Sequence, residues 1–137
     1  SFCAERSRWL DKILCASTRH SLIVTHHPVF PTYIDWMDPK SMRWTEFLGS
    51  VIDDHRNKII GLTSGHIHRA IHTRAFGVQA SSCPSTAHQV ALDFESAGPS
   101  FSQEAPGFQI HRIEGGHLTS YTASFDRFLT AFDPRGS

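Results

Sequence analysis

The 137-residue sequence has little of several features that define common protein classes. Thirteen Lys and Arg residues balance thirteen Asp and Glu residues, so the formal charge is +0 and the pI is near 7.1. This balance argues against a basic nucleic-acid-binding surface and against electrostatic anchoring to a membrane. Charged residues at 19% and apolar residues at 39% exclude both a disordered chain and a transmembrane one. No internal repeat and no low-complexity segment is present, so we expect one domain over residues 1–137.

Cysteine is also scarce. Cys3, Cys15 and Cys83 form no CxxC pair and leave an odd residue over, which argues against a secreted disulfide framework and against a clustered structural zinc site. The N-terminus lacks the charged-then-apolar pattern of a signal peptide. We therefore expect reduced thiols in a cytoplasmic protein. The sequence has no initiator Met, so we expect it to begin inside a gene, after processing, or at a boundary chosen for expression.

Histidine, by contrast, is abundant. It occurs ten times, whereas asparagine occurs once, at Asn57. Histidine is the commonest metal ligand and titrates near neutral pH, so its abundance suggests a metal site. Half of the histidines are dispersed, and we interpret them as surface or partly buried residues. These are His20, His55, His72, His111 and His117.

The first half of the sequence alternates helix and strand patterns. Apolar residues at helical spacing predict helices over residues 5–16 and 40–56, and short apolar runs predict buried strands over residues 21–25 and 58–63. Asp38, which precedes a proline, is expected to cap the second helix. The apolar stripe of that helix consists of Trp44, Phe47, Leu48, Val51 and Ile52. Histidines follow both strands, at the end of an open α/β sheet where ligands bind.

The second half is expected to be a meander of short strands. Residues 88–94 alternate, with Val90, Leu92 and Phe94 expected on one face. Residues 108–113 and 117–125 predict two further strands, joined by a hairpin turn at Gly115-Gly116. The tail that ends in residues 133–137 is expected to be frayed. The predicted fold class is therefore α/β, with the order helix-strand-helix-strand followed by a β-meander.

Two histidine clusters carry the chemistry. His66 and His68 would point to opposite faces of an extended chain, but a loop after the strand, or two metals flanking it, removes that difficulty. Gly65 is expected to let the backbone turn tightly before them. His26 and His27 form the second cluster, and two strands that flank one crossover helix are neighbours, so His26 and His66 are expected to converge. Ordinary hydrogen-bonded loop histidines remain the alternative for both clusters.

The order of three motifs resembles a known family. Thr25-His26-His27-Pro28, then Gly65-His66-Ile67-His68, then Cys83-Pro84-Ser85-Thr86-Ala87-His88-Gln89, is similar to the calcineurin-like metallophosphoesterases, and most to their class III cyclic-nucleotide phosphodiesterase branch. The resemblance covers nearly the whole chain but only the C-terminal half of that family's catalytic domain. It implies the C-terminal half of a metallophosphoesterase-type α/β/β/α sandwich and hydrolysis of a small phosphodiester, cyclic nucleotide or other.

The resemblance also implies roles for individual residues. His26 and His66 would ligate one metal and His68 the other, the ions being manganese, iron or zinc. A hydroxide bridging the two ions would attack phosphorus in line. His27 would orient a ligand or contact substrate, and His88 would line the pocket. A purely structural role stays open for both of these residues.

Other parts of the family pattern are missing. The N-terminal half of the family supplies an Asp-x-His, a Gly-Asp and a Gly-Asn-His, but this sequence has no Gly-Asp and Asn57 follows no glycine. Asp53-Asp54-His55 matches the first string, but it lies on the polar side of the second helix, and we interpret it as a solvated helix end. We therefore expect a piece of an enzyme that is inactive alone.

Such a half-sheet would leave an exposed strand edge, which predicts self-association or pairing with the missing N-terminal half. Two alternatives remain: a non-catalytic metal-binding or scaffold module that retains the half-fold, and a histidine-rich metal carrier.

Overall fold

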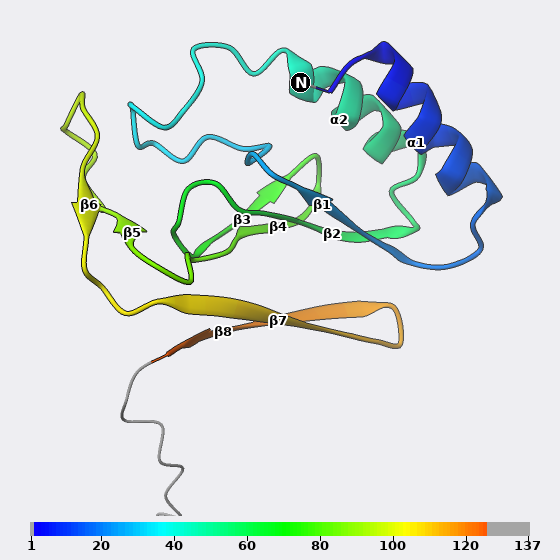
Figure 1. The fold of residues 1–137 in the computed structure, drawn as a ribbon. Coiled ribbons are helices and arrows are strands. Elements are labelled where there is room, and N and C mark those ends of the chain that lie inside the picture. The colour runs from blue at the N-terminus through cyan, green and yellow to red at the C-terminus, as the bar shows by residue number, and fades with distance from the viewer. Residues whose placement is uncertain (1, 126–137) are drawn as a thin grey trace, which may run out of the picture.

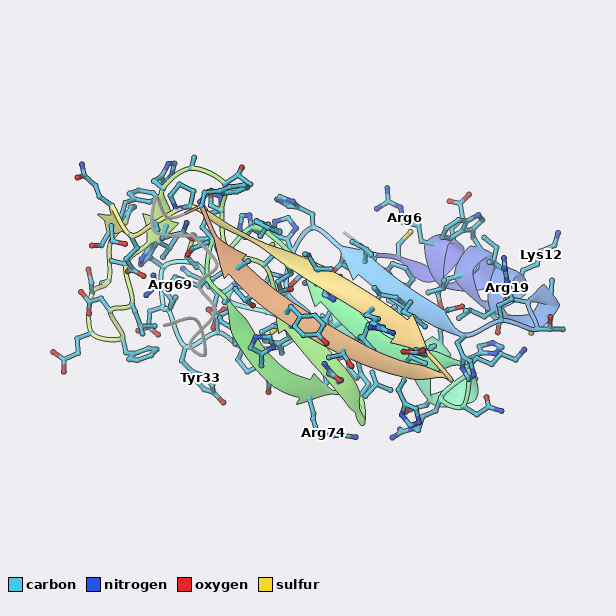
Figure 2. The ribbon with its side chains drawn as sticks, turned by 90° about the horizontal axis from the view of Figure 1, so that it is seen from below. Arg6, Lys12, Arg19, Tyr33, Arg69 and Arg74 are labelled. Atoms are coloured by element: carbon cyan, nitrogen blue, oxygen red, sulfur yellow. The ribbon has the colours of Figure 1, made fainter. Side chains whose placement is uncertain are left out.

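The computed structural model of the chain describes residues 2–125. A four-stranded sheet lies in the middle, two helices cover one of its faces, and a long β-hairpin crosses the opposite face (Figure 1). The view from below shows the same hairpin in front of the sheet (Figure 2). Leu118 of the hairpin lies where a side chain on Gly61 of the sheet would stand, so the glycine allows the two layers to approach closely.

The central sheet is mixed, and the chain is therefore an α/β protein, as predicted. Helix α1 spans Ala4–Ala16, β1 Ser21–Thr25, α2 Trp44–Asp54 and β2 Ile59–Ser64. A hairpin of β3, Ile71–Ala75, and β4, Val78–Ser82, completes the sheet. The strand order is β1-β2-β4-β3, in which β1, β2 and β4 are parallel and β3 is antiparallel to β4.

The main core lies between the helices and the sheet. Leu48, Val51 and Ile52 of α2 are at most 4% exposed and pack with Leu14 of α1 and with strand residues such as Leu62. Each side chain of this size contributes about 1.5–3 kcal/mol by its burial. The predicted stripe of α2 is thus confirmed for these three residues.

Several apolar side chains of both helices are more exposed than the prediction of buried helix faces implies. On α2, Phe47 is 46% exposed and Trp44 is half-buried. On α1, Trp9 is 61% and Ile13 45% exposed, and only Leu14 is buried. Trp9 and Ile13 of α1 line a groove together with β1, an edge strand of the sheet, whose Val24 is 71% exposed.

The predicted start of the second helix is wrong. Helix α2 begins at Trp44, and Arg43, not Asp38, occupies its N-cap position. The Asp38 carboxylate instead accepts hydrogen bonds from the Thr32 backbone N–H at 2.8 Å, the Thr32 hydroxyl at 2.7 Å and the Tyr33 N–H at 2.9 Å. The donors of this earlier loop therefore compete successfully for the carboxylate that the local sequence assigns to a cap.

The alternating stretch at residues 88–94 is not one strand. Only β5, Gln89–Val90, is extended, and it pairs with β6, Phe101–Ser102. Val90 is 1% exposed, but Leu92 and Phe94 are 59% and 57% exposed, so the three do not share a buried face. The alternation is local and has no sheet to continue it.

The last hairpin agrees with prediction. Strand β7 spans Gly107–Glu114 and β8 spans His117–Ser124, and Gly115 and Gly116 between them have positive φ values of 56° and 79°. The predicted frayed tail lies outside the described residues. None of the helices in residues 2–125 is long and apolar enough to cross a membrane.

The dispersed histidines follow the prediction with one exception. His20, His72 and His117 are exposed and His111 is partly buried. His55 is only 7% exposed, so its assignment to a solvated helix end is wrong, although Asp53 and Asp54 beside it are exposed. The reason is that the His55 ring turns inward from the end of α2 and its Nε2 lies 2.7 Å from Asp11 Oδ1 on α1. This contact with α1 explains why His55 is buried while Asp53 and Asp54 are exposed. 

Candidate active site

The candidate active site lies at the carboxyl ends of β1 and β2. His26 and His27 follow β1 directly, and His66 follows β2 after one glycine. The two strands are parallel neighbours, so their following loops meet at one edge of the sheet. The backbone N–H of Gly65 donates to the carbonyl of His26 at 3.1 Å and joins the two loops.

Three imidazoles converge at this edge. His66 Nδ1 lies 3.2 Å from His26 Nε2, and the ring centroid of His27 lies 4.3 Å from that of His66 and 4.8 Å from that of His26. One nitrogen from each of the three rings falls within 4.8 Å of the other two. The structure thus brings His26 and His66 together as expected, and it adds His27, which the sequence did not place among the ligands.

The loop that carries His66 and His68 is shaped by a buried residue between them. Ile67 is 1% exposed and packs with Ile34 and Val90. His66 and His68 take positive φ values of 66° and 54° on either side of it. Gly65 is not among the residues with positive φ, so the tight turn expected there falls on the histidines themselves. A left-handed non-glycine residue costs about 1–3 kcal/mol, and such strain concentrates at functional sites.

His68 lies apart from the three converging rings. Its ring stacks edge-on against His88 at a centroid distance of 5.2 Å. Its Nδ1 atom is buried and has no hydrogen-bond partner among the described residues. Ser82 secures the loop, because its hydroxyl donates to the carbonyl of Arg69 at 2.7 Å. The loop therefore holds the buried Nδ1 atom of His68 in place without a hydrogen-bond partner among the described residues.

His88 belongs to a row of aromatic rings. The Gln89 side chain closes the preceding loop, with Oε1 accepting from the Ser85 N–H at 3.0 Å and Nε2 donating to the Ser85 carbonyl at 2.8 Å. His88 lies edge-on to Phe101 at 5.0 Å, and Phe101 lies edge-on to Trp36 at 5.7 Å. The row begins at His68 and continues through His88 and Phe101 to Trp36.

A cleft of about 490 Å³ opens beside the cluster. His26, His27 and His66 form one wall, and Arg6, visible on α1 in Figure 2, lines it together with Phe2, Thr25, Met37, Pro39 and Trp44. The volume falls in the range of small-molecule sites, about 300–1,000 Å³. The cleft thus contains one cationic side chain, Arg6, and three imidazoles, although the net charge of the chain is zero.

The electrostatics of the site favour the neutral form of the His66 imidazole. Burial lowers the pKa of His66 below its ordinary value, and the nearby His27, His26 and His68 lower it further. A neutral imidazole has a lone pair available, which is the form that binds metals. In the part of the chain that the structure describes, this group of ligand atoms contains no carboxylate.

The sequence did not reveal several of these residues. Arg6 lines the cleft, and Trp36 and Phe101 extend the row of rings that begins at His68; no spacing rule connects these three residues to the histidine motifs. A second group of ligand-type side chains, Asp11, Cys15 and His55, was also missed. Its only local signal is the spacing of four residues between Asp11 and Cys15, which places both on one face of a helix.

Comparison with known proteins supports the resemblance. No protein-family profile matches the sequence. The chain is 39% identical over 71 residues to a Ruthia magnifica protein named "Probable cyclic nucleotide phosphodiesterase", covering 52% of this chain and 30% of that protein. It is 31% identical over 75 residues to the 3',5'-cyclic adenosine monophosphate phosphodiesterase CpdA of Haemophilus influenzae, covering 55% of this chain and 27% of that protein.

The aligned part of the chain spans less than a third of either relative's length. Within that range, the chain is similar in sequence to cyclic nucleotide phosphodiesterases of the class III metallophosphoesterase type, which confirms the resemblance predicted from its motifs.

Proposed function

We propose that the chain provides one side of a metal-dependent site that hydrolyses a phosphodiester bond in a cyclic nucleotide. The observation that carries this proposal is the convergence of His26, His27 and His66 at the carboxyl ends of two parallel strands. The similarity to proteins named cyclic nucleotide phosphodiesterases supports the substrate class. We propose that the fold is the C-terminal half of an α/β/β/α sandwich; the helices, the central sheet and the β7–β8 hairpin, which form three layers, support this assignment (Figure 1).

The residues present fit a metal site. Three imidazole nitrogens are within reach of one ion, and the buried His68 Nδ1 is a donor atom without a partner among the described residues. Imidazole suits zinc, iron and manganese to different degrees. We assign His26 and His66 to one ion and His68 to a second, with His27 either contacting substrate or completing the first set.

The metal pair, when bound, would supply Lewis-acid stabilisation of the charge that develops during in-line displacement at phosphorus. The chain's own residues do the rest. Arg6 attracts the phosphate into the cleft, His27 lies where it can contact a phosphoryl oxygen, and the buried Ile67 keeps His66 and His68 fixed in their strained backbone positions. Water adds to phosphorus and one ester oxygen leaves with a proton, which gives a phosphomonoester.

The aromatic row favours a nucleotide over other small diesters. His88, Phe101 and Trp36 extend from His68 in consecutive edge-on contacts, and Phe101 is 55% exposed. Exposed aromatic faces bind nucleobases by stacking, at about 1–3 kcal/mol per base. We infer that the base of the substrate lies against Phe101 and that His88 lines the pocket between the base and the metals.

The histidine set requires further ligands. Three histidines divided between two ions leave the second ion with one protein ligand, and no carboxylate joins the group within residues 2–125. We propose that Asp and Asn ligands come from polypeptide outside these 137 residues, which pairs with the open edge of β1. In its absence the chain is expected to self-associate through that edge and to be inactive. A monomer by light scattering at micromolar concentration contradicts the self-association.

The first experiment measures manganese and zinc binding by calorimetry, together with hydrolysis of a chromogenic phosphodiester and of cyclic AMP. We expect the double variant His26→Ala, His66→Ala to bind fewer metal ions per chain than His72→Ala, His117→Ala, which is altered at exposed histidines. Equal binding by both double variants refutes the site.

Hydrolysis separates the enzyme from its alternative. Hydrolysis that appears only when the complementary polypeptide is added, and that the His26→Ala, His66→Ala variant loses, supports the phosphodiesterase. Metal binding without hydrolysis in the completed assembly favours the non-catalytic metal-binding module, an alternative that the all-histidine ligand set supports.

A further inference from the structure

A second group of metal-type ligands lies between the two helices, away from the histidine cluster. It consists of Asp11 and Cys15 on α1 and His55 at the end of α2. His55 Nε2 lies 2.7 Å from Asp11 Oδ1 and 3.9 Å from Cys15 Sγ, and Cys15 Sγ lies 3.8 Å from Asp11 Oδ1. The same ring nitrogen thus faces both other ligand atoms, and the three atoms form a closed triangle.

The backbone positions all three side chains. Asp11 and Cys15 are four residues apart on α1 and therefore share one face of the helix. His55 is the C-cap residue of α2; its N–H donates to Val51 at 3.2 Å and its carbonyl accepts from Lys58 at 2.8 Å. The helices lie side by side (Figure 1), so the ring of His55 is aimed at α1 from a fixed base.

A lysine ties the end of α1 to the same place. Lys58 Nζ donates to the carbonyls of Leu14 and Ser17, each at 2.9 Å. These carbonyls belong to the last turn of α1 and its end, where a cation is favourable. Because Lys58 also bonds His55 through its backbone, one residue fixes the distance between Cys15 and His55.

The donor set and its dimensions match zinc. Thiolate, imidazole and carboxylate are the ligands that zinc prefers, at about 2.0–2.3 Å from the ion, so donor atoms in a tetrahedral site stand roughly 3.3–3.6 Å apart. Two sides of the triangle, at 3.8 and 3.9 Å, need to shorten by a few tenths of an ångström. The third needs to lengthen, and the Asp11 side chain, 50% exposed, has room to move.

Access and charge are also suitable. Cys15 is exposed and His55 is buried, so an ion would enter from solvent and rest against the protein interior. A thiolate and a carboxylate together balance a divalent ion. The exposed side of the triangle leaves a fourth position for water, as in zinc sites with three protein ligands.

We propose that Asp11, Cys15 and His55 form a binding site for a zinc-class divalent cation that joins α1 to the end of α2. The site contains a thiolate, whereas the candidate active site contains only imidazoles. The two sites are therefore distinguishable by spectroscopy, and this proposal can fail or hold independently of the phosphodiesterase.

The test is a cobalt(II) titration, because a thiolate bound to cobalt gives a near-ultraviolet charge-transfer absorption that imidazole does not. The starting protein is the double variant Cys3→Ala, Cys83→Ala, in which Cys15 is the only thiol. We expect this absorption to saturate at one cobalt per chain, to bleach on addition of zinc, and to be lost when Cys15→Ala is added. Circular dichroism checks that each variant is folded.

Two ligand variants complete the test. His55→Ala should lower the affinity for cobalt by more than the roughly 10- to 100-fold that loss of a supporting residue costs. Asp11→Asn, on the surface of α1, should weaken binding in the same direction and guards against unfolding of the His55 variant. Absence of thiolate absorption in the Cys15-only protein overturns the proposal. The proposal is also overturned if the thiolate absorption appears but neither variant changes the affinity for cobalt, since Cys15 would then bind cobalt without Asp11 and His55.

Discussion

Replacement of Asp38 should destabilise the protein far more than its position in a loop suggests. Its two carboxylate oxygens accept hydrogen bonds from three donors: the N–H and the hydroxyl of Thr32, which is 6% exposed, and the N–H of Tyr33. In Asp38→Ala the buried Thr32 N–H loses its acceptor, which costs about 1–3 kcal/mol, and the loss of charge-assisted bonds adds to this. We expect the free energy of unfolding to fall by about 2–4 kcal/mol.

Asp38→Asn should cost less, about 1 kcal/mol. The amide oxygen can take the place of Oδ2 and accept from both backbone N–H groups, and the amide nitrogen can donate to the Thr32 hydroxyl, so mainly the charge is lost. Urea unfolding followed by circular dichroism measures the series, with Asp35→Asn, exposed in the same loop, as the matched control. The control should stay within about 0.5 kcal/mol of the unchanged protein. An Asp38→Ala protein as stable as the control refutes the reasoning.

Three further predictions concern other parts of the fold. Gly49→Ala should lower the free energy of unfolding measured in urea, because the new Cβ would stand 2.8 Å from a ring carbon of Phe76. This clash should outweigh the gain of about 1 kcal/mol in helix propensity, and a more stable variant contradicts the packing. Iodoacetamide near neutral pH should modify Cys3 before Cys83, as peptide mapping would show: backbone N–H groups of the first turn of α1 lower the pKa of Cys3, and burial raises that of Cys83. Burial, with a smaller effect of a neighbouring histidine, lowers the pKa of His111, so the unfolded chain binds its proton more readily and stability should fall as pH drops below about 6.5. His111→Gln should flatten this fall, and an unchanged slope argues against the shift.

The meeting of the two histidine loops was predictable because it follows from topology. A short apolar strand, a helix and a second apolar strand form a parallel pair, and the segments that follow the two strands must then emerge at the same edge. His26 and His66 are the residues at those two positions, and their ring nitrogens lie 3.2 Å apart. No knowledge of side-chain packing was needed for this part of the site.

Asp38 shows where local signals fail. Its sequence context, an aspartate before a proline and an apolar helical stripe, is a good N-cap pattern. The Thr32 and Tyr33 donors lie six and five residues earlier, respectively, in a loop whose conformation includes a positive φ of 63° at Tyr33. N-cap rules consider only the backbone N–H groups that follow the capping residue, so they do not include donors that precede it. The helix was therefore predicted to begin four residues too early.

The pairing of His55 with Asp11 was beyond sequence reasoning for a different reason. The two residues are 44 positions apart and meet only because α1 and α2 pack on the same face of the sheet. The string Asp53-Asp54-His55 looks uniformly polar, and only the packing of α2 separates its exposed carboxylates from the buried ring. A run of polar residues therefore predicts that a helix end is mostly exposed, but it does not predict which of those residues is buried.

His26 and His27 are adjacent in the sequence, and their roles as metal ligands need to be distinguished. In an extended strand His26 and His27 would point to opposite faces, and the family motif gives the ligand role to His26 alone. The strand ends at Thr25, however, and the Thr25 hydroxyl donates to the carbonyl of His27 at 2.7 Å, which curls the chain so that both rings face His66. The motif and the geometry thus agree on His26 and differ on His27. Separate His26→Ala and His27→Ala variants in the metal titration decide between them: equal losses of affinity would make His27 a ligand, and a loss confined to His26→Ala would leave His27 to the substrate.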